Sequence, residues 1–207
     1  MKRPPKIPKN LFEKCAKLNS ELQDLGLNIS EHDLLSKIYS YLDEFNQFVK
    51  AFTKCSRGCG SYCCNIPVTI TYIEAQYIGI KKEIKVNKPI SIIPDLSNIM
   101  PKIIDNKKYF NKCPFLNNHN DCSIYGSRPF VCRTYHIVEA PVACKNLTKD
   151  SVLYGSPKME LTPNGLLINF SNDILTSLYS KVMVYNHRKD LPFNDIREYF
   201  PSLQSQP

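Results

Sequence analysis

The chain has 207 residues, of which 43% are hydrophobic and 22% are charged, and its formal net charge at pH 7 is +8. This composition argues against an intrinsically disordered chain, and the length suits one folded domain. No apolar run reaches the roughly 18–20 residues that a membrane-spanning helix needs. We therefore expect a folded protein without a membrane partner.

The excess of 27 basic over 19 acidic residues raises nucleic acid as a partner, because basic proteins bind phosphate backbones. The lysines are scattered, however, and no basic stripe alternates with aromatic residues. If eight thiolates held two divalent ions, the net charge would fall to about +4. Nucleic acid is thus only weakly supported as a partner, and an unknown protein partner or substrate stays open.

At the start of the chain, residues 1–9 combine basic charge with three prolines and indicate a disordered basic arm. No hydrophobic segment of a signal peptide follows this arm, so we expect a cytoplasmic protein. Residues 10–50 carry apolar side chains at every third or fourth position and predict an N-terminal helical hairpin. Gly26 ends its first helix, and Ser30 is the N-cap of its second. Cys15 lies within the first apolar stripe, where we expect a buried small side chain and not a ligand.

We expect residues 51–190 to form a cysteine-cluster metal-binding domain, followed by a loosely ordered tail over residues 191–207. The β-branched run at 68–73 predicts a short strand. Thr71 and Glu74 have the spacing of a capping box, which predicts that a helix starts there.

Three further elements are predicted downstream. A short helix is expected over 96–104, and a β-hairpin over 158–170 turns at Pro163-Asn164-Gly165. A last long helix follows Ser171, its N-cap. Together the elements predict a mostly helical α+β fold with an irregular cysteine-rich metal-binding centre and a short β-hairpin.

The strongest signal in the chain is the spacing of eight of its nine cysteines. In a reducing cytoplasm, such clusters are metal ligands or redox groups more often than disulfides. Gly58 and Gly60 give the first set the backbone freedom that a tight metal-binding turn needs. The two sets are Cys55-x3-Cys59-x3-Cys63-Cys64 and Cys113-x8-Cys122-x9-Cys132-x11-Cys144.

The adjacent pair Cys63-Cys64 leaves the number of centres open. In extended backbone, successive side chains point to opposite faces, so the two thiols would serve different centres, or one would bind metal while the other packs or reacts. The eight cysteines permit two four-thiolate sites or one centre with spare thiols. His119 and His136 are alternative ligands, although His119 lies in the polar loop NNHND, where a solvated side chain is expected.

Two segments carry a resemblance to a known family: CSRGCGSYCC followed by TYIEAQYIGI, and KCPFLNNHNDCSIYGSRPFVCRTYHI. Over roughly residues 50–145, the chain resembles the YkgJ-like CxxCxxCC family, which is described as a zinc- or iron-chelating domain. The order CPFL, CSIY, RP and CR is the specific part of the resemblance. The first set departs from the family pattern, because it has three residues between cysteines where the family usually has two. The broader family includes flagellin lysine N-methylases, which are associated with an iron–sulfur cluster.

The resemblance implies metal binding by these cysteines, with Arg128 and Arg133 next to the thiolates to offset their charge. The wide spacing of the second set is more typical of cluster ligation than of paired zinc knuckles. We therefore expect an iron–sulfur cluster, with zinc as the alternative. The chain has no glycine-rich nucleotide loop, no radical-enzyme motif and no readable nucleophile–base pair. Both a redox or methyl-transfer-related role and a non-catalytic zinc module that binds protein or nucleic acid stay open.

Overall fold

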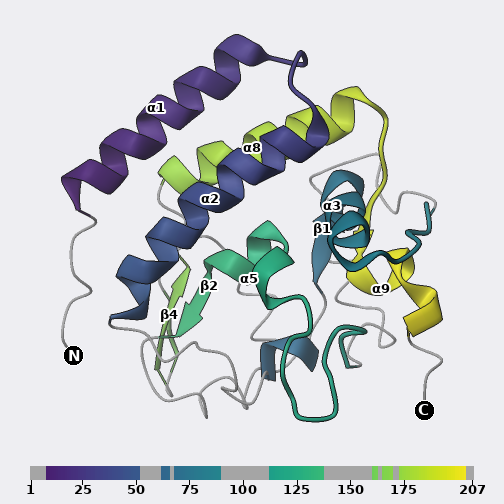
Figure 1. The fold of residues 1–207 in the computed structure, drawn as a ribbon. Helices are drawn as coiled ribbons and strands as arrows, with labels where there is room; N and C mark the ends of the chain where they lie inside the picture. Colours follow the sequence, from purple (N-terminus) through teal and green to yellow (C-terminus); the bar gives the residue numbers. More distant parts are fainter. Residues whose placement is uncertain are drawn as a thin grey trace.

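The computed structural model describes residues 8–51, 62–65, 68–89, 112–137, 160–162, 165–169 and 173–203. Over these residues the fold is α+β and mostly helical, which confirms the predicted fold class (Figure 1). Most of the predicted basic arm and the helix predicted over 96–104 lie outside the described residues. None of the described helices is both long and apolar enough to cross a membrane.

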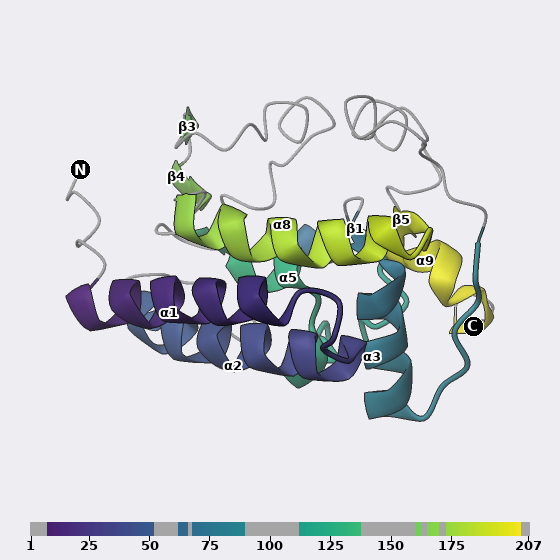
Figure 2. The same cartoon turned by 90° about the horizontal axis from the view of Figure 1, so that it is seen from above.

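The three longest helices in the described part of the chain form one layer. They are α1 (Lys9–Leu25), α2 (Glu31–Lys50) and α8 (Asp173–Arg188), and they run alongside one another (Figures 1 and 2). Each helix turns an apolar stripe toward the other two, so the hairpin predicted for residues 10–50 is joined by a helix from far along the chain. The shared core contains Leu11, Cys15, Leu22, Leu35, Ile38, Leu42, Phe45, Leu178 and Val182.

The turn between α1 and α2 forms as the sequence predicts. Gly26 adopts a φ of 55° and donates its N–H to the carbonyl of Leu22 at 3.2 Å, which ends α1. The Ser30 hydroxyl oxygen accepts the N–H of Asp33 at 3.1 Å and caps α2. The Tyr185 hydroxyl on α8 donates to the carbonyl of Ile29 at 2.8 Å, which fastens the third helix to this turn.

The predicted strand and capping box are also confirmed. β1 (Thr69–Thr71) leads directly into α3 (Tyr72–Lys82). The Thr71 hydroxyl accepts the N–H of Glu74 at 3.3 Å, and the Glu74 carboxylate accepts the N–H of Thr71 at 2.9 Å. These reciprocal bonds satisfy two backbone donors that a helix start otherwise leaves without partners.

The prediction of a loosely ordered tail over 191–207 is wrong for residues 193–203. β5 (Phe193–Asp195) pairs antiparallel with β1, and α9 (Ile196–Tyr199) and a 3₁₀ turn, η5 (Pro201–Leu203), follow it. The prolines in this segment mark the borders of short elements and do not disrupt them. A second core forms here from Val68, Ile70, Ala75, Ile78, Cys113, Phe115, Leu116, Ile124, Ile196, Tyr199 and Phe200.

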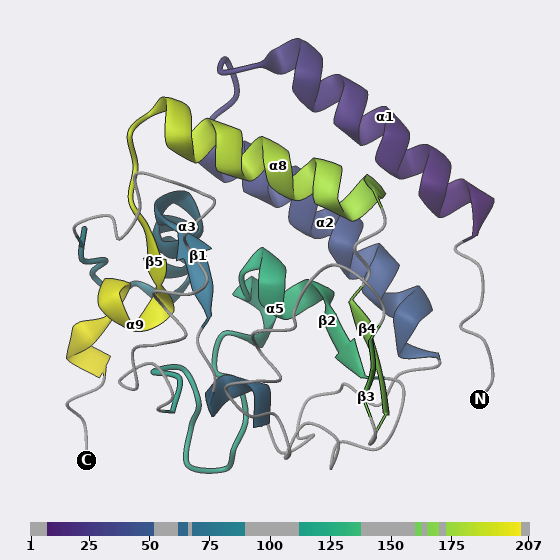
Figure 3. The same ribbon diagram turned by 180° about the vertical axis from the view of Figure 1, so that it is seen from behind.

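The remaining elements lie under the helical layer. α5 (Phe130–Thr134) is followed by β2 (Tyr135–Ile137), which pairs with β4 (Gly165–Asn169), and β3 (Glu160–Thr162) completes a three-stranded sheet beside α5 (Figure 3). The antiparallel β3–β4 pair, with Thr162 opposite Gly165, confirms the predicted hairpin. Two 3₁₀ turns, η1 (Tyr62–Asn65) and η4 (Tyr125–Ser127), belong to the cysteine-bearing segments.

Candidate metal centre

Five of the predicted ligands are described: Cys63, Cys64, Cys113, Cys122 and Cys132, and all five are free thiols. The other three, Cys55, Cys59 and Cys144, lie outside the described residues, as do Gly58 and Gly60 of the predicted metal-binding turn. Cys15 is 1% exposed within the core of the helical layer, where the sequence predicted it.

The two cysteine sets meet through the backbone. Cys63 and Cys64 lie on η1, and the carbonyl of Cys64 accepts the N–H of Cys113 at 2.7 Å. This bond joins the end of the first set directly to the start of the second. The contact cannot be read from the spacing, because it links segments that are far apart in the chain.

A small loop then brings Cys122 back toward Cys113. Leu116 and Cys122 form an antiparallel bridge, and the N–H of Ser123 donates to the carbonyl of Phe115 at 2.8 Å. The Asn117 side chain closes the loop by accepting the N–H groups of His119 and Asp121, both at 2.9 Å. The loop is therefore fixed by its own hydrogen bonds, and the His119 side chain is exposed on it, as predicted.

The thiols gather at the edge of the second core. Cys113 belongs to this core and is 8% exposed, and Cys64, Cys122 and Cys132 pack against it. His136 lies on β2, opposite Ile168 of β4. β2 directly follows α5, the helix that carries Cys132.

The pKa values of four of the five described thiols, Cys63, Cys113, Cys122 and Cys132, are raised. Burial raises the pKa of Cys113 to about 12 and also raises the pKa values of Cys122 and Cys132. A hydrogen bond with Cys64 is the largest cause that raises the pKa of Cys63. The Cys132 pKa is raised further by Cys63, Cys113 and Cys122, so these sulfurs lie within electrostatic reach of one another. Bringing them to the thiolate form therefore calls for a compensating positive charge.

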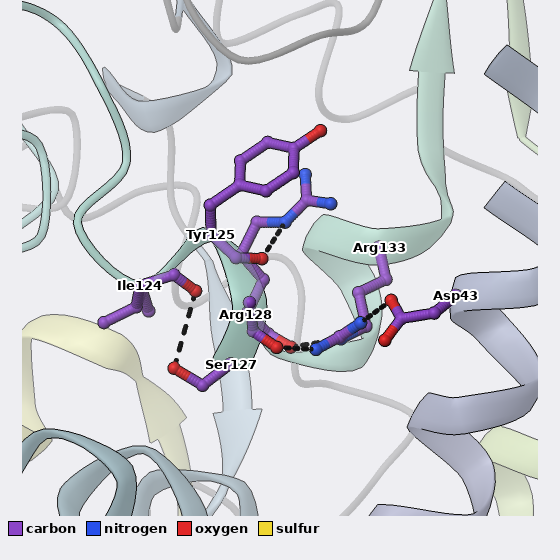
Figure 4. Close-up of polar contacts among 7 residues, drawn as sticks. Asp43, Ile124, Tyr125, Ser127, Arg128 and Arg133 are labelled. Atoms are coloured by element: carbon purple, nitrogen blue, oxygen red, sulfur yellow. Dashed lines mark hydrogen bonds and ion pairs between the residues drawn. The ribbon is translucent and has the colours of Figure 1, made fainter. Parts of the chain in front are cut away.

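Arg128 supplies part of that charge. It lowers the pKa values of Cys63, Cys122 and Cys132 against the effects that raise them. Its Nε donates to the carbonyl of Tyr125 at 3.0 Å, and its guanidinium lies 3.7 Å from the centre of the Tyr125 ring (Figure 4). The predicted role of Arg128 beside metal-bound thiolates stays a prediction.

Arg133 is placed differently from the prediction. Its side chain is 1% exposed, donates to the carbonyls of Arg128 and Gly126, and forms an ion pair with Asp43 of α2 (Figure 4). Its guanidinium also lies 4.3 Å from the centre of the Tyr39 ring. Its contacts within the described part of the chain are thus with oxygen atoms and a ring, and they tie α5 to α2.

A polar cleft of about 430 Å³ opens beside Arg133. It is lined by side chains of α2 together with Tyr77, Gly126 and Arg133. None of the five described cysteines is among the described residues that line this cleft, so it is separate from these thiols.

The donor set fits a thiophilic metal. Sulfur ligands select zinc, iron–sulfur clusters and similar soft centres over magnesium or calcium. Among the described residues alone, no three Cys, His, Asp or Glu side chains are close enough together to hold an ion. The chemistry of the thiols therefore fits the predicted centre, while the assignment of individual ligands stays a prediction.

Sequence reasoning missed part of the network around the thiols. It assigned Glu74 only to the capping box, yet this carboxylate also accepts hydrogen bonds from Tyr39 and from the N–H of Phe130. The available signal was a single acidic residue among the apolar neighbours Ile73, Ala75 and Ile78, all of which are buried with it.

Comparisons with known proteins agree with this description. The model of the CxxCxxCC family, described as "putative zinc- or iron-chelating domain", matches residues 54–151. The match includes every predicted ligand and confirms the resemblance drawn from the sequence. No curated protein and no solved structure matched the chain.

Proposed function

We propose that residues 54–151, which match the model of the CxxCxxCC family of zinc- or iron-chelating domains, bind a metal centre through cysteine thiolates. The proposed ligand pool is the eight cysteines of the two sets, from which each centre takes four. The pool consists of Cys55, Cys59, Cys63, Cys64, Cys113, Cys122, Cys132 and Cys144.

The observation that carries this proposal is the meeting of the two sets. The Cys113 N–H donates to the Cys64 carbonyl at 2.7 Å, and four thiols lie in or against one apolar core. Thiols that raise one another's pKa are costly to ionise unless a cation offsets the charge of the thiolates. A metal ion supplies this charge and replaces several protons at once. The free thiols also agree with the reducing cytoplasm in which we place the protein.

We favour an iron–sulfur cluster over zinc as the bound group. The second set is spread over long intervals, whereas all-cysteine zinc sites usually consist of two compact knuckles. When bound, a cluster supplies electron transfer at a potential that nearby charges such as Arg128 adjust. A redox or methyl-transfer-related role extends the proposal and rests on the resemblance to the flagellin lysine N-methylases.

A structural zinc module is the second candidate. It is favoured by the shortness of the elements at the thiols, since α5 has five residues and η4 has three. Such a segment gains its order from a bound ion more than from its own helices. In this case the domain would present a surface to a protein or nucleic acid without catalysing a reaction.

The test is to purify the full chain without oxygen and to measure iron, zinc and sulfide together with the optical spectrum. A brown protein with iron, sulfide and broad visible absorption supports the cluster, and a colourless protein with zinc supports the module. Protein without either metal would contradict both proposals. Cys15→Ala is the matched control, because its thiol lies in the helical core and should not change the metal content.

A further inference from the structure

A buried carboxylate joins three separate segments next to the thiols. Glu74 is 1% exposed and has no ionic partner among its hydrogen bonds to described residues. One oxygen, Oε2, accepts from the backbone N–H and the hydroxyl of Thr71, at 2.9 and 3.0 Å. The other, Oε1, accepts from the hydroxyl of Tyr39 at 3.0 Å and from the N–H of Phe130 at 2.8 Å. Four donors therefore compensate the cost of burying this group.

The bond to Phe130 has a specific effect on the cysteine segment. Phe130 is the first residue of α5. The N–H groups at the start of a helix have no partners within the helix itself. Glu74 therefore caps α5 from another part of the chain. Cys132 lies two residues farther along the same short helix.

A second anchor holds the other end of α5. Arg133 follows Cys132 directly and is tied to Asp43 and to the carbonyls of Gly126 and Arg128. The Tyr39 side chain connects the two anchors, because its hydroxyl donates to Glu74 while its ring lies against the Arg133 guanidinium. The Glu74 carboxylate and the Arg133 guanidinium are thus linked through the Tyr39 side chain.

We propose that Glu74 is a positioning residue for the metal centre: by accepting the Phe130 N–H, it fixes α5 and so sets the position of the Cys132 sulfur. This inference rests on the proposed function, since it assigns Cys132 to the centre. Glu74 itself binds no metal in this proposal. Glu74 acts on Cys132 indirectly, through the backbone between Phe130 and Cys132.

The test compares Glu74→Gln with Thr71→Val in the full chain. Gln keeps the shape of the side chain, but one half of its amide is an NH₂ group, which must face either the Thr71 N–H or the Phe130 N–H. In the second orientation the Phe130 N–H loses its acceptor. In the first it keeps only a neutral amide oxygen, which accepts a weaker hydrogen bond than a carboxylate. Thr71→Val removes only the hydroxyl that serves the capping box and leaves the bond between Glu74 and Phe130 intact. Both variants therefore weaken the start of α3, and only Glu74→Gln weakens the bond that holds α5.

The first measurement is metal affinity per folded molecule, by competition with a chromophoric chelator using the metal found in the wild type. We expect Glu74→Gln to weaken retention by about tenfold or more, as for other groups that orient metal ligands, and Thr71→Val to match the wild type. Equal retention in both variants would overturn the inference.

The second measurement needs no metal. In metal-stripped protein, we expect iodoacetamide to alkylate Cys132 faster in Glu74→Gln than in wild type, with Cys15 as the internal reference. If the wild type binds no metal, the proposed function fails, and this rate still decides whether Glu74 positions Cys132. Should Glu74→Gln not fold, Tyr39→Phe removes one of the two donors to Oε1 and should raise the Cys132 rate by a smaller amount. Identical rates in Tyr39→Phe, Thr71→Val and wild type would then count against the inference.

Discussion

The helical layer and the cysteine-bearing segment are built on different principles. α1, α2 and α8 bury a continuous set of apolar side chains, each of which contributes roughly 1.5–3 kcal/mol when fully buried. The segment over 112–134 has only η4 and α5 as described helices, and its core mixes apolar residues with thiols. The layer can therefore hold itself together, whereas the segment depends on groups outside it.

Those outside groups come from the layer and from α3. Asp43 of α2 pairs with Arg133, Tyr39 of α2 contacts both Arg133 and Glu74, and Glu74 of α3 caps α5. The difference teaches that the helical layer and α3 position the cysteine-bearing segment through polar side chains, of which Tyr39 and Glu74 are buried. The proposed metal supplies the remaining constraint.

The largest effect is expected from Cys132→Ser, which tests whether the cysteine-bearing segment depends on the metal while the helical layer does not. We expect loss of bound metal and a disordered cysteine segment, because structural metal binding contributes on the order of 10 kcal/mol, comparable to a whole domain's stability. The helical content measured by circular dichroism should stay largely intact, since α1, α2 and α8 bury their own core. A fully metallated Cys132→Ser protein would remove Cys132 from the proposed ligand set.

Phe45→Ala tests the other half. Phe45 is 1% exposed in the core of the layer, and truncating a buried Phe costs about 3–5 kcal/mol. We expect a lower urea midpoint, while the metal content per folded molecule matches the wild type. Metal loss in proportion to the loss of stability would show that the two regions unfold as one unit.

The regular elements were predictable because their signals are local. The Thr71–Glu74 capping box, the Gly26 terminator and the β3–β4 hairpin each depend on residues a few positions apart. Cys15 was assigned to the core for the same reason, since it shares the apolar stripe of α1.

The parts that sequence reasoning missed depend on distant partners. Residues 193–195 become a strand only because β1 offers an edge to pair with, and the role of Glu74 depends on Tyr39 and Phe130 from other segments. Arg133 and Arg128 have the same local context of thiols, yet only the fold places Arg133 against Asp43. Spacing along a chain carries no information about such contacts.

The pH dependence of metal affinity tests whether thiols of the cysteine-bearing segment bind the metal. The pKa values of Cys63, Cys122 and Cys132 are raised in the metal-free protein, and that of Cys113 is raised to about 12. Thiols that bind a metal must lose their protons. Each proton released makes the apparent affinity rise about tenfold per pH unit. If two thiols release protons, we expect about a hundredfold tighter binding for each unit of pH gained near neutrality. Chelator competition at several pH values measures this slope, and a flat profile would contradict thiol ligation.

The raised pKa of Cys113 also affects the stability of the metal-free protein, which should fall as the pH rises. The folded state holds its thiol protons to a higher pH than the unfolded state, whose cysteines ionise near 9. The protonated Cys113 thiol therefore contributes fully to the free energy of unfolding below about pH 9. This contribution is lost as the pH rises toward about 12. Urea unfolding of the metal-free chain between pH 8 and 10 should show this decline, and metal-loaded protein, whose thiols are already ionised, should not show it.

The smallest expected effect is that of Cys15→Ser, which tests whether the helical layer is independent of the centre. Cys15 is 1% exposed, and burial raises its pKa to about 11. A serine hydroxyl at this apolar position costs about 1–3 kcal/mol, part of which a hydrogen bond with Tyr41 offsets, since this residue already bonds the thiol. The urea midpoint should fall modestly, and iron or zinc per protein should be unchanged. A drop in bound metal would mean that a thiol of the helical layer belongs to the centre, and the division between a self-sufficient layer and a dependent cysteine segment would fail.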